Sequence, residues 1–194
     1  MSLFFRPDVT RDFLAQHAGS RILDIGCGAN KVRTDAVGVD RVPSPGVDIV
    51  HDLNAIPWPL SAARSGAIVA RHVFEHLDDI PAVMGEIRRL LQPRGEVLIA
   101  APHFSDASSY IDPTHKYHLA AETFVTFCRE PMAWFDLGTV YVEIPGRWRN
   151  IGYEAYVNRP SERHNALSRQ MQRWEAKHCF TRRGGQIFAR LKLR

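Results

Sequence analysis

Residues 22–30 read ILDIGCGAN, an apolar run that contains one acidic residue and ends in a turn with two glycines. Such a run is typical of a strand that is buried on both faces of a parallel sheet. The glycines allow a sharp bend and let the backbone approach a ligand closely. We therefore predict a buried strand followed by a ligand-binding turn, in which Cys27 is a small residue between Gly26 and Gly28. Nothing near Cys27 in the sequence would activate a thiolate.

The rest of the chain alternates between short apolar runs and amphipathic segments, which is typical of an α/β fold. Further strands are expected at 36–39, 47–50, 67–70, 96–101, 139–144 and 186–193. Helices are expected at 8–17, 80–91, about 121–128 and after Ser161. About ten residues separate the first two strands, which is too few for a full crossover helix, so we expect one or two helical turns there.

Acidic residues follow three successive predicted strands, at Asp24, Asp40 and Asp52. The carboxyl ends of parallel strands meet at one edge of the sheet, where open α/β sheets bind ligands. Asp40 is placed to accept hydrogen bonds from both hydroxyls of a ribose, and Asp52 to accept one from an adenine amino group while Leu53 holds the ring. One acid alone is better explained as a helix cap or a surface charge. Three at successive strand ends favour a binding site.

The run DIGCGANK, followed by GVD, HDL, ARHVFEHLDD and GEVLIAAPH, resembles the superfamily of methyltransferases that use S-adenosylmethionine (SAM), in particular its small-molecule type. The resemblance covers roughly residues 20–104 well and the remainder in outline. It implies a Rossmann-like, doubly wound, mostly parallel seven-stranded sheet with helices on both faces. It also implies SAM as the cofactor and S-adenosylhomocysteine as its product.

The resemblance further implies which positions contact SAM. Asp24, Gly26 and Gly28 line the methionyl part, and the segment after the fourth strand passes next to the cofactor. The implied positions are Asp24, Gly26, Cys27, Gly28, Asp40, Arg41, Asp52, Leu53, Arg71 and His72. The sequence departs from the family pattern at Asn30, which replaces a third glycine. Asparagine tolerates positive φ, so we expect Asn30 to occupy the same bend.

Two histidines are candidates for the chemical step. If the acceptor is a hydroxyl or an ammonium, a base must remove a proton, and histidine is the usual side chain for this near neutral pH. His103 follows the fifth predicted strand, beside the expected methyl group, and is the first candidate for a base or an acceptor-orienting group. His115 is the second, and similar methyltransferases carry a comparable Asp-Pro-Thr-His segment. Alternatively, Asp112 and Thr114 cap the helix that follows, and His115 is structural.

The sequence does not lead us to expect a metal. The spacing of His115 and His118 would suit a pair of metal ligands, but no third ligand has a convincing spacing. Glu75 and His76 place a carboxylate beside an imidazole. We expect His76 to pack structurally at the start of the following helix, and the role of Glu75 stays open.

The 194 residues, 45% of them hydrophobic, fit a single domain, with a core at 20–104 and acceptor-side and C-terminal segments at 105–194. No apolar run approaches the roughly 20 residues that span a bilayer, and no secretory signal is recognisable, so we expect a cytoplasmic protein. Three cysteines without a CxxC spacing predict reduced thiols.

Charge is uneven along the chain, because residues 159–194 carry a net charge of +8 and the remainder −4. A basic segment attracts nucleic acid, an anionic lipid surface or a phosphorylated substrate, although a solvated helix explains it as well. We favour a small-molecule or glycan-like acceptor with a hydroxyl or an amine. The alternatives are an RNA methyltransferase, a non-catalytic SAM-binding subunit and, less favoured, a nicotinamide-dependent oxidoreductase, for which the full GxGxxG phosphate turn is missing.

Overall fold

The computed structural model describes residues 9–142, 177 and 185–194, without the side chains of residues 139 and 141. Its strands are β1 (Ile22–Ile25), β2 (Val37–Asp40), β3 (Ile49–Val50), β4 (Ser65–Arg71), β5 (Leu91–Pro102), β6 (Phe135–Val142) and β7 (Gln186–Leu193). Its helices are α1 (Val9–Gln16), α2 (Ile80–Leu90), α3 (Ser108–Ile111) and α4 (Ala121–Val125), and single 3₁₀ turns are η1 (Phe74–His76) and η2 (Thr126–Cys128).

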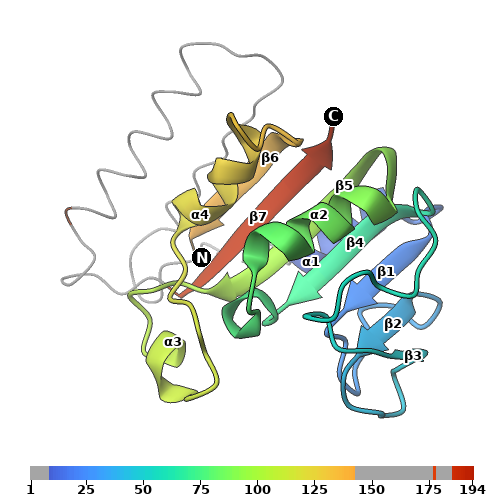
Figure 1. The fold of residues 1–194 in the computed structure, drawn as a ribbon, viewed down its shortest axis with the longest axis horizontal. Helices are drawn as coiled ribbons and strands as arrows, with labels where there is room; N and C mark the ends of the chain where they lie inside the picture. The colour runs from blue at the N-terminus through green and yellow to red at the C-terminus, as the bar shows by residue number, and fades with distance from the viewer. Residues whose placement is uncertain (1–8, 143–176, 178–184) are drawn as a thin grey trace, which may run out of the picture.

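The strands form one seven-stranded sheet in the order β3-β2-β1-β4-β5-β7-β6 (Figure 1). Strands β1 to β5 pair in parallel, and β7 runs antiparallel between β5 and β6. The carboxyl ends of β1, β2, β4 and β5 therefore lie along one edge, with α3 beyond the end of β5 (Figure 1). The predicted Rossmann-like, mostly parallel sheet is confirmed.

Helices cover both faces of the sheet. Along β1, the side chain of Ile22 joins one face with Phe13 of α1, whereas Leu23 and Ile25 belong to the larger core on the opposite face. This alternation follows from the two-residue period of a strand. The larger core contains the buried side chains of α2 and α4, so α1 lies on one side and these two helices lie on the other.

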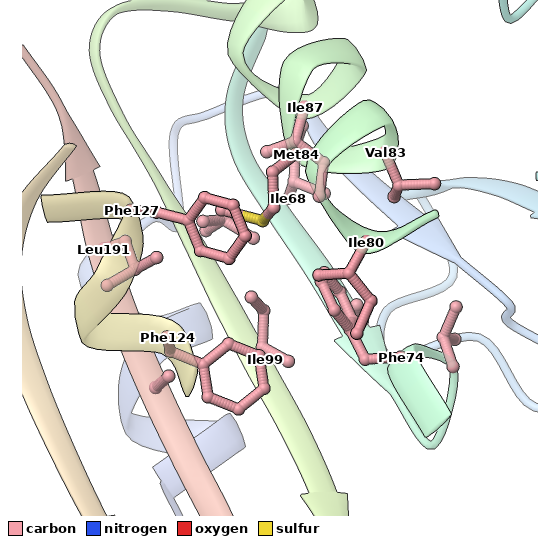
Figure 2. Packing of buried hydrophobic residues seen from close by; sticks show 14 of the residues in the cluster. Ile68, Phe74, Ile80, Val83, Met84, Ile87, Ile99, Phe124, Phe127 and Leu191 are labelled. Carbon is pink, nitrogen blue, oxygen red and sulfur yellow. The ribbon is translucent and has the colours of Figure 1, made fainter. Parts of the chain in front are cut away.

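Helix α2 shows how the sequence builds this core. Its apolar residues recur every three or four positions, and the side chain of Asp79 caps its first turn by accepting a hydrogen bond from the backbone N–H of Ala82 (2.9 Å). Figure 2 shows Met84 and Ile87 directed into the space over β4 and β5. Burying each such side chain stabilises the fold by about 1.5–3 kcal/mol.

The same core fixes the segment that follows β4. Phe74 in η1 is fully buried and packs edge-on against Phe124 of α4, with ring centroids 5.6 Å apart (Figure 2). An aromatic pair of this kind adds about 0.5–1.5 kcal/mol beyond its area burial. Because Phe74 is anchored, its neighbours on either side are held at the carboxyl edge.

The connection between β1 and β2 differs from the prediction, since it consists of turns and contains no helix. The backbone N–H of Val32 donates to Oδ2 of Asp24 (2.8 Å), and that of Ala36 donates to the carbonyl of Arg33 (3.1 Å). Local bonds of this kind satisfy the backbone without a helical turn. The expected helix is therefore wrong, because the connection is too short to hold a helix and the two turns that flank it.

Three strands, β4, β5 and β6, start earlier than predicted, at positions where the strand pairing is irregular. β5 starts at Leu91, which pairs with Ser65 before the register shifts. β6 starts at Phe135, and its register with β7 shifts around Gly138. Bulges of this kind interrupt the alternation that marks a strand in sequence. The short helix α3 was also not predicted.

In the part of the chain that the structure describes, no helix is both long and apolar enough to cross a membrane. The helix expected after Ser161 and most of the basic segment at 159–194 lie outside the described residues.

Candidate active site

A pocket of about 160 Å³ opens at the carboxyl edge of the sheet. Its lining includes several positions predicted to bind SAM, namely Gly26, Asp40, Arg41, Asp52, Leu53 and His72. The residues that the sequence did not indicate are Asn54, Val73, His76 and Leu77. A larger cavity of about 440 Å³ lies at the opposite, amino edge, between Arg21 and Leu90, and contains none of the predicted site residues. The carboxyl-edge pocket is therefore the candidate site.

The glycine turn after β1 approaches the segment after β4 very closely. Gly26 has a φ of +67°, and a Cβ atom on it would lie 2.2 Å from Cγ2 of Val73. Gly28 also has a positive φ of +53°, but the space around it is open. Only glycine combines this backbone conformation with this approach. The prediction that Asn30 replaces a third glycine in the bend is wrong, because Asn30 does not have a positive φ. Its backbone N–H donates to the carbonyl of Cys27 (3.3 Å), and this hydrogen bond closes the turn.

Asp24 is the buried acid beneath this turn, with 1% of its surface exposed. Its Oδ2 accepts the hydrogen bond from Val32, and Nη2 of Arg71 lies 3.9 Å from the same atom. Its Oδ1 is buried without a hydrogen-bond partner among the described residues. Burial raises the pKa of Asp24, against the opposing effects of the Val32 hydrogen bond and the Arg71 charge. The carboxyl group thus holds the turn and leaves one oxygen for a donor.

Asp40 stands at the end of β2 in a fixed orientation. Its Oδ2 accepts a hydrogen bond from the backbone N–H of Gly28 (2.9 Å), and its Oδ1 accepts one from that of Val42 (2.9 Å). Each carboxylate oxygen has a second lone pair. The geometry therefore leaves Asp40 able to accept hydrogen bonds from a pair of neighbouring hydroxyls.

The far side of the pocket combines one acid with an apolar wall. Asp52 is exposed, and its Oδ1 accepts a hydrogen bond from the backbone N–H of Asn54 (2.9 Å). Leu53, Val73 and Leu77 are buried and line the same pocket. An apolar wall with a few oriented polar groups is typical of a site for a flat ring.

Four predicted positions lie outside the pocket lining, namely Asp24, Gly28, Cys27 and Arg71. Cys27 is buried, and its Sγ lies 3.5 Å from the carbonyl oxygen of Gly46. Burial and the nearby carboxylate of Asp24 raise the pKa of this thiol to about 11, so it is not a nucleophile at neutral pH. Arg71 donates a hydrogen bond from Nη2 to the carbonyl of Asn30 (2.8 Å) and so ties β4 to the glycine turn.

His72 is half-exposed and lines the pocket in an unusual backbone conformation. Its φ is +54°, and its backbone N–H donates to the carbonyl of Ala100 (2.8 Å). A left-handed conformation costs a non-glycine residue about 1–2 kcal/mol. The bend turns the chain from β4 across the glycine turn, and the Nδ1 atom of His72 comes within 3.3 Å of Oε1 of Glu75.

His103, the first catalytic candidate, follows β5 as predicted but has no exposed surface and does not line the pocket. Its Nδ1 accepts a hydrogen bond from the backbone N–H of Ser105 (3.3 Å) and lies 2.8 Å from the Ser105 hydroxyl. A backbone N–H can only donate, so this arrangement assigns the ring proton to Nε2.

His115, the second candidate, has a side chain that is 8% exposed. Its Nδ1 donates a hydrogen bond to the carbonyl of Ser109 (3.0 Å), and its ring lies against that of His76 with centroids 4.7 Å apart. His118 lies apart from this contact, stacked on Tyr110 at 4.0 Å. His76, expected to be structural, therefore lines the pocket and contacts His115.

The capping alternative for the segment before α4 is wrong. Oδ1 of Asp112 accepts hydrogen bonds from the backbone N–H and the hydroxyl of Thr114, which closes a local turn. Helix α4 begins later, and there the hydroxyl of Thr123 accepts a hydrogen bond from the backbone N–H of Ala120 (3.3 Å). Asp112 and Thr114 thus shape the segment around His115.

A mostly parallel sheet with one antiparallel strand next to its edge, a glycine turn after β1 and carboxylates after successive strands define the class I SAM-dependent methyltransferases. A family model for the methyltransferase domain matches residues 3–179, and the chain belongs to this family. It is an enzyme that uses SAM as its methyl donor.

Solved structures share the fold along nearly the whole chain. A SAM-dependent methyltransferase from Mesorhizobium loti is 14% identical, with 95% of each chain covered and a TM-score of 0.55. One from Archaeoglobus fulgidus is 20% identical, with 95% of this chain and 91% of its own covered and a TM-score of 0.56. Phosphoethanolamine N-methyltransferase 2 from Haemonchus contortus, solved in complex with SAM, is 15% identical, with 96% of this chain and 52% of its own covered and a TM-score of 0.57. A search of curated proteins finds no match.

Proposed function

We propose that the carboxyl-edge pocket binds SAM and that the enzyme transfers its methyl group to a hydroxyl or an amine of a small or glycan-like molecule. The proposal that this pocket binds SAM rests on one observation. Gly26, Asp40 and Asp52 come from three separate strand ends and line the same pocket. Bound SAM supplies a methyl group on a sulfonium sulfur, which is transferred by in-line displacement.

The residues present fit this cofactor. The close approach at Gly26 suits the methionyl part, and so does Oδ1 of Asp24, which has no partner in the described part of the chain and can accept from the ammonium group. The fixed carboxylate of Asp40 suits the ribose hydroxyls. Asp52 and the buried Leu53 suit the amino group and the ring of adenine.

The hydrogen bonds favour His115 over His103 as the base. The Nδ1 proton of His115 is engaged by the carbonyl of Ser109, so its Nε2 carries the lone pair that can accept a proton. His103 has the reverse arrangement, since Ser105 engages the Nδ1 lone pair and leaves a proton on Nε2. A fully buried N–H donor suits a positioning role better than proton removal. A neutral imidazole near the pocket is what a hydroxyl or ammonium acceptor requires.

The test is titration calorimetry of the full chain with SAM, repeated on Asp40→Ala. We expect micromolar binding by the natural chain and at least tenfold weaker binding by Asp40→Ala, which corresponds to about 1.4 kcal/mol or more. Asp35→Ala is the matched control, because Asp35 is an exposed acid just before β2 and does not line the pocket. Equal affinity in Asp40→Ala and Asp35→Ala would place SAM elsewhere.

RNA is a second candidate acceptor, favoured by one observation, the net charge of +8 at residues 159–194. An RNA contact made by several Lys and Arg side chains weakens steeply as salt is added, because bound counterions are released. Electrophoretic mobility shifts with a structured RNA, measured between about 50 mM and 200 mM salt, test this candidate. Binding that weakens steeply over this range would favour RNA over a small-molecule acceptor. Absence of binding at the lower salt concentration would remove RNA as the acceptor.

A further inference from the structure

Three residues outside the predicted cofactor positions converge at one place near the pocket. Glu75, His76 and His115 each offer a ligand atom, and these atoms lie within 4.8 Å of one another. Sequence spacing does not indicate this set, because His115 comes from a segment about forty residues away from the other two. We propose that Glu75, His76 and His115 bind a divalent transition-metal ion of the zinc type.

Glu75 is the strongest indication of a missing cation. It has no exposed surface, and neither of its carboxylate oxygens has a hydrogen-bond partner among the described residues. Nδ1 of His72 lies 3.3 Å from Oε1, but its geometry does not make a hydrogen bond. A buried carboxylate without hydrogen bonds is strongly disfavoured unless it is protonated or faces a cation.

His115 is held in the tautomer that a metal ligand needs. Its Nδ1–H donates to the carbonyl of Ser109 at 3.0 Å, which leaves the lone pair on Nε2. Histidines that bind metals usually donate their other ring N–H to a carbonyl or a carboxylate in this way.

His76 is oriented by a similar chain of hydrogen bonds. The hydroxyl of Thr114 donates its proton to Oδ1 of Asp112 (2.7 Å), so the same oxygen can only accept from Nδ1 of His76 (3.0 Å). The proton of His76 is therefore on Nδ1 and its lone pair is on Nε2. Both histidines thus have an unprotonated Nε2 available as a ligand atom, and Glu75 has a carboxylate without hydrogen-bond partners among the described residues.

The backbone holds the two parts of the site together. The backbone N–H groups of Lys116 and Tyr117 donate to the carbonyl of Glu75 at 2.7 Å and 3.3 Å, which fixes the segment around His115 against η1. Two imidazoles and one carboxylate form a ligand set that suits Zn²⁺ and related ions better than Mg²⁺ or Ca²⁺, which prefer oxygen. The inference does not depend on which acceptor is methylated, but it competes with the role of His115 as a base, because one Nε2 lone pair cannot bind a metal ion and accept a proton at the same time.

The test is a titration of the metal-free full chain with Co²⁺, followed by the visible d–d absorption of the bound ion. We expect one Co²⁺ per chain, displaced by Zn²⁺, and at least tenfold weaker binding in His115→Ala and in Glu75→Gln. His118→Ala is the matched control, because His118 lies in the same segment and stacks on Tyr110. It should bind Co²⁺ as the natural chain does.

Calorimetric binding of SAM to the same variants reports whether they are folded. Because His115 does not line the cofactor pocket, His115→Ala decides the question even if Glu75→Gln fails to fold. Absence of d–d bands in the natural chain would overturn the proposal. So would bands that keep the same affinity in His115→Ala, since the ion would then be bound elsewhere.

Discussion

The two sides of the site are built in different ways. On the cofactor side, the turn after β1 and the acid after β2 are fixed by hydrogen bonds to backbone N–H groups, such as those of Gly28 and Val32. On the acceptor side, His76 and His115 are fixed by contacts between η1 and a segment about forty residues further along the chain. Positions on the first side are therefore encoded locally, whereas those on the second depend on the tertiary fold.

The largest effect is expected at the closest approach on the cofactor side. In Gly26→Ala, the new Cβ atom would lie 2.2 Å from Cγ2 of Val73 in a backbone conformation that alanine rarely adopts. Strain and overpacking together should lower the free energy of unfolding by about 3 kcal/mol. Binding of SAM should weaken at least a hundredfold.

Gly28→Ala is the matched control for this change. Gly28 has a similar φ but open space around it, so only the backbone cost of about 1–2 kcal/mol applies. Urea unfolding of both variants measures the difference. Equal destabilisation by the two substitutions would show that the contact with Val73 is not a tight one.

Asp24→Asn should separate stability from function. Because burial raises the pKa of Asp24 in the folded state, the folded protein holds this proton more tightly than the unfolded chain. The charged carboxyl group therefore lowers the stability of the fold. This loss begins as the pH rises above the ordinary pKa of 3.8 and is complete once the pH has passed the raised pKa of the folded state. Asparagine keeps an acceptor for Val32 and removes this cost.

At pH 7 we expect Asp24→Asn to raise the Tm by a few degrees and to weaken SAM binding about tenfold. The difference in Tm between the variant and the natural chain should shrink as the pH falls toward 4. A lower Tm in Asp24→Asn at pH 7 would contradict the assigned cost of the buried charge.

A smaller effect is expected behind the apolar wall. Nε1 of Trp58, which is 2% exposed, donates a hydrogen bond to the carbonyl of Leu53 (2.9 Å). Trp58→Phe removes this donor, so the carbonyl of Leu53 loses its hydrogen bond, and the free energy of unfolding should fall by about 1–3 kcal/mol. Binding of SAM should weaken by a few fold, as measured by calorimetry. Unchanged affinity would show that Leu53 is positioned by other contacts.

The smallest effect on the cofactor is expected from the acceptor side. His115→Ala should leave the Kd for SAM within about twofold of the natural value, since His115 does not line the pocket. A tenfold loss of affinity for SAM in His115→Ala would contradict the separation of the cofactor side from the acceptor side, because the two would then be coupled.

How far the sequence predicts the molecule follows the same division. The sequence predicts strands β1, β2 and β4 because each is a short apolar run. It also predicts the pocket positions Asp40 and Asp52, because each is an acid at the end of such a run. One or two helical turns were expected after β1, but the short connection contains none, and the backbone N–H of Val32 donates to Oδ2 of Asp24 instead. The spacing shows that the connection is short, but it does not show that a side chain satisfies the backbone there.

The acceptor side was predicted less completely. His115 was singled out as a catalytic candidate, but its contact with His76 was not predicted, because it depends on the backbone hydrogen bond from Lys116 to Glu75. On the cofactor side, Val73 and Leu77 were missed in the pocket because they follow β4 in an irregular segment that begins with the strained His72. A positive φ at a bulky residue leaves no signature in the sequence.

The most direct test of the account is a crystal structure of the full chain with S-adenosylhomocysteine. We predict that the ribose hydroxyls bind the carboxylate of Asp40 and that the adenine lies against Leu53, with its amino group toward Asp52. A nucleoside bound in the cavity at the amino edge, between Arg21 and Leu90, or bound without contact to Asp40, would contradict the central claim.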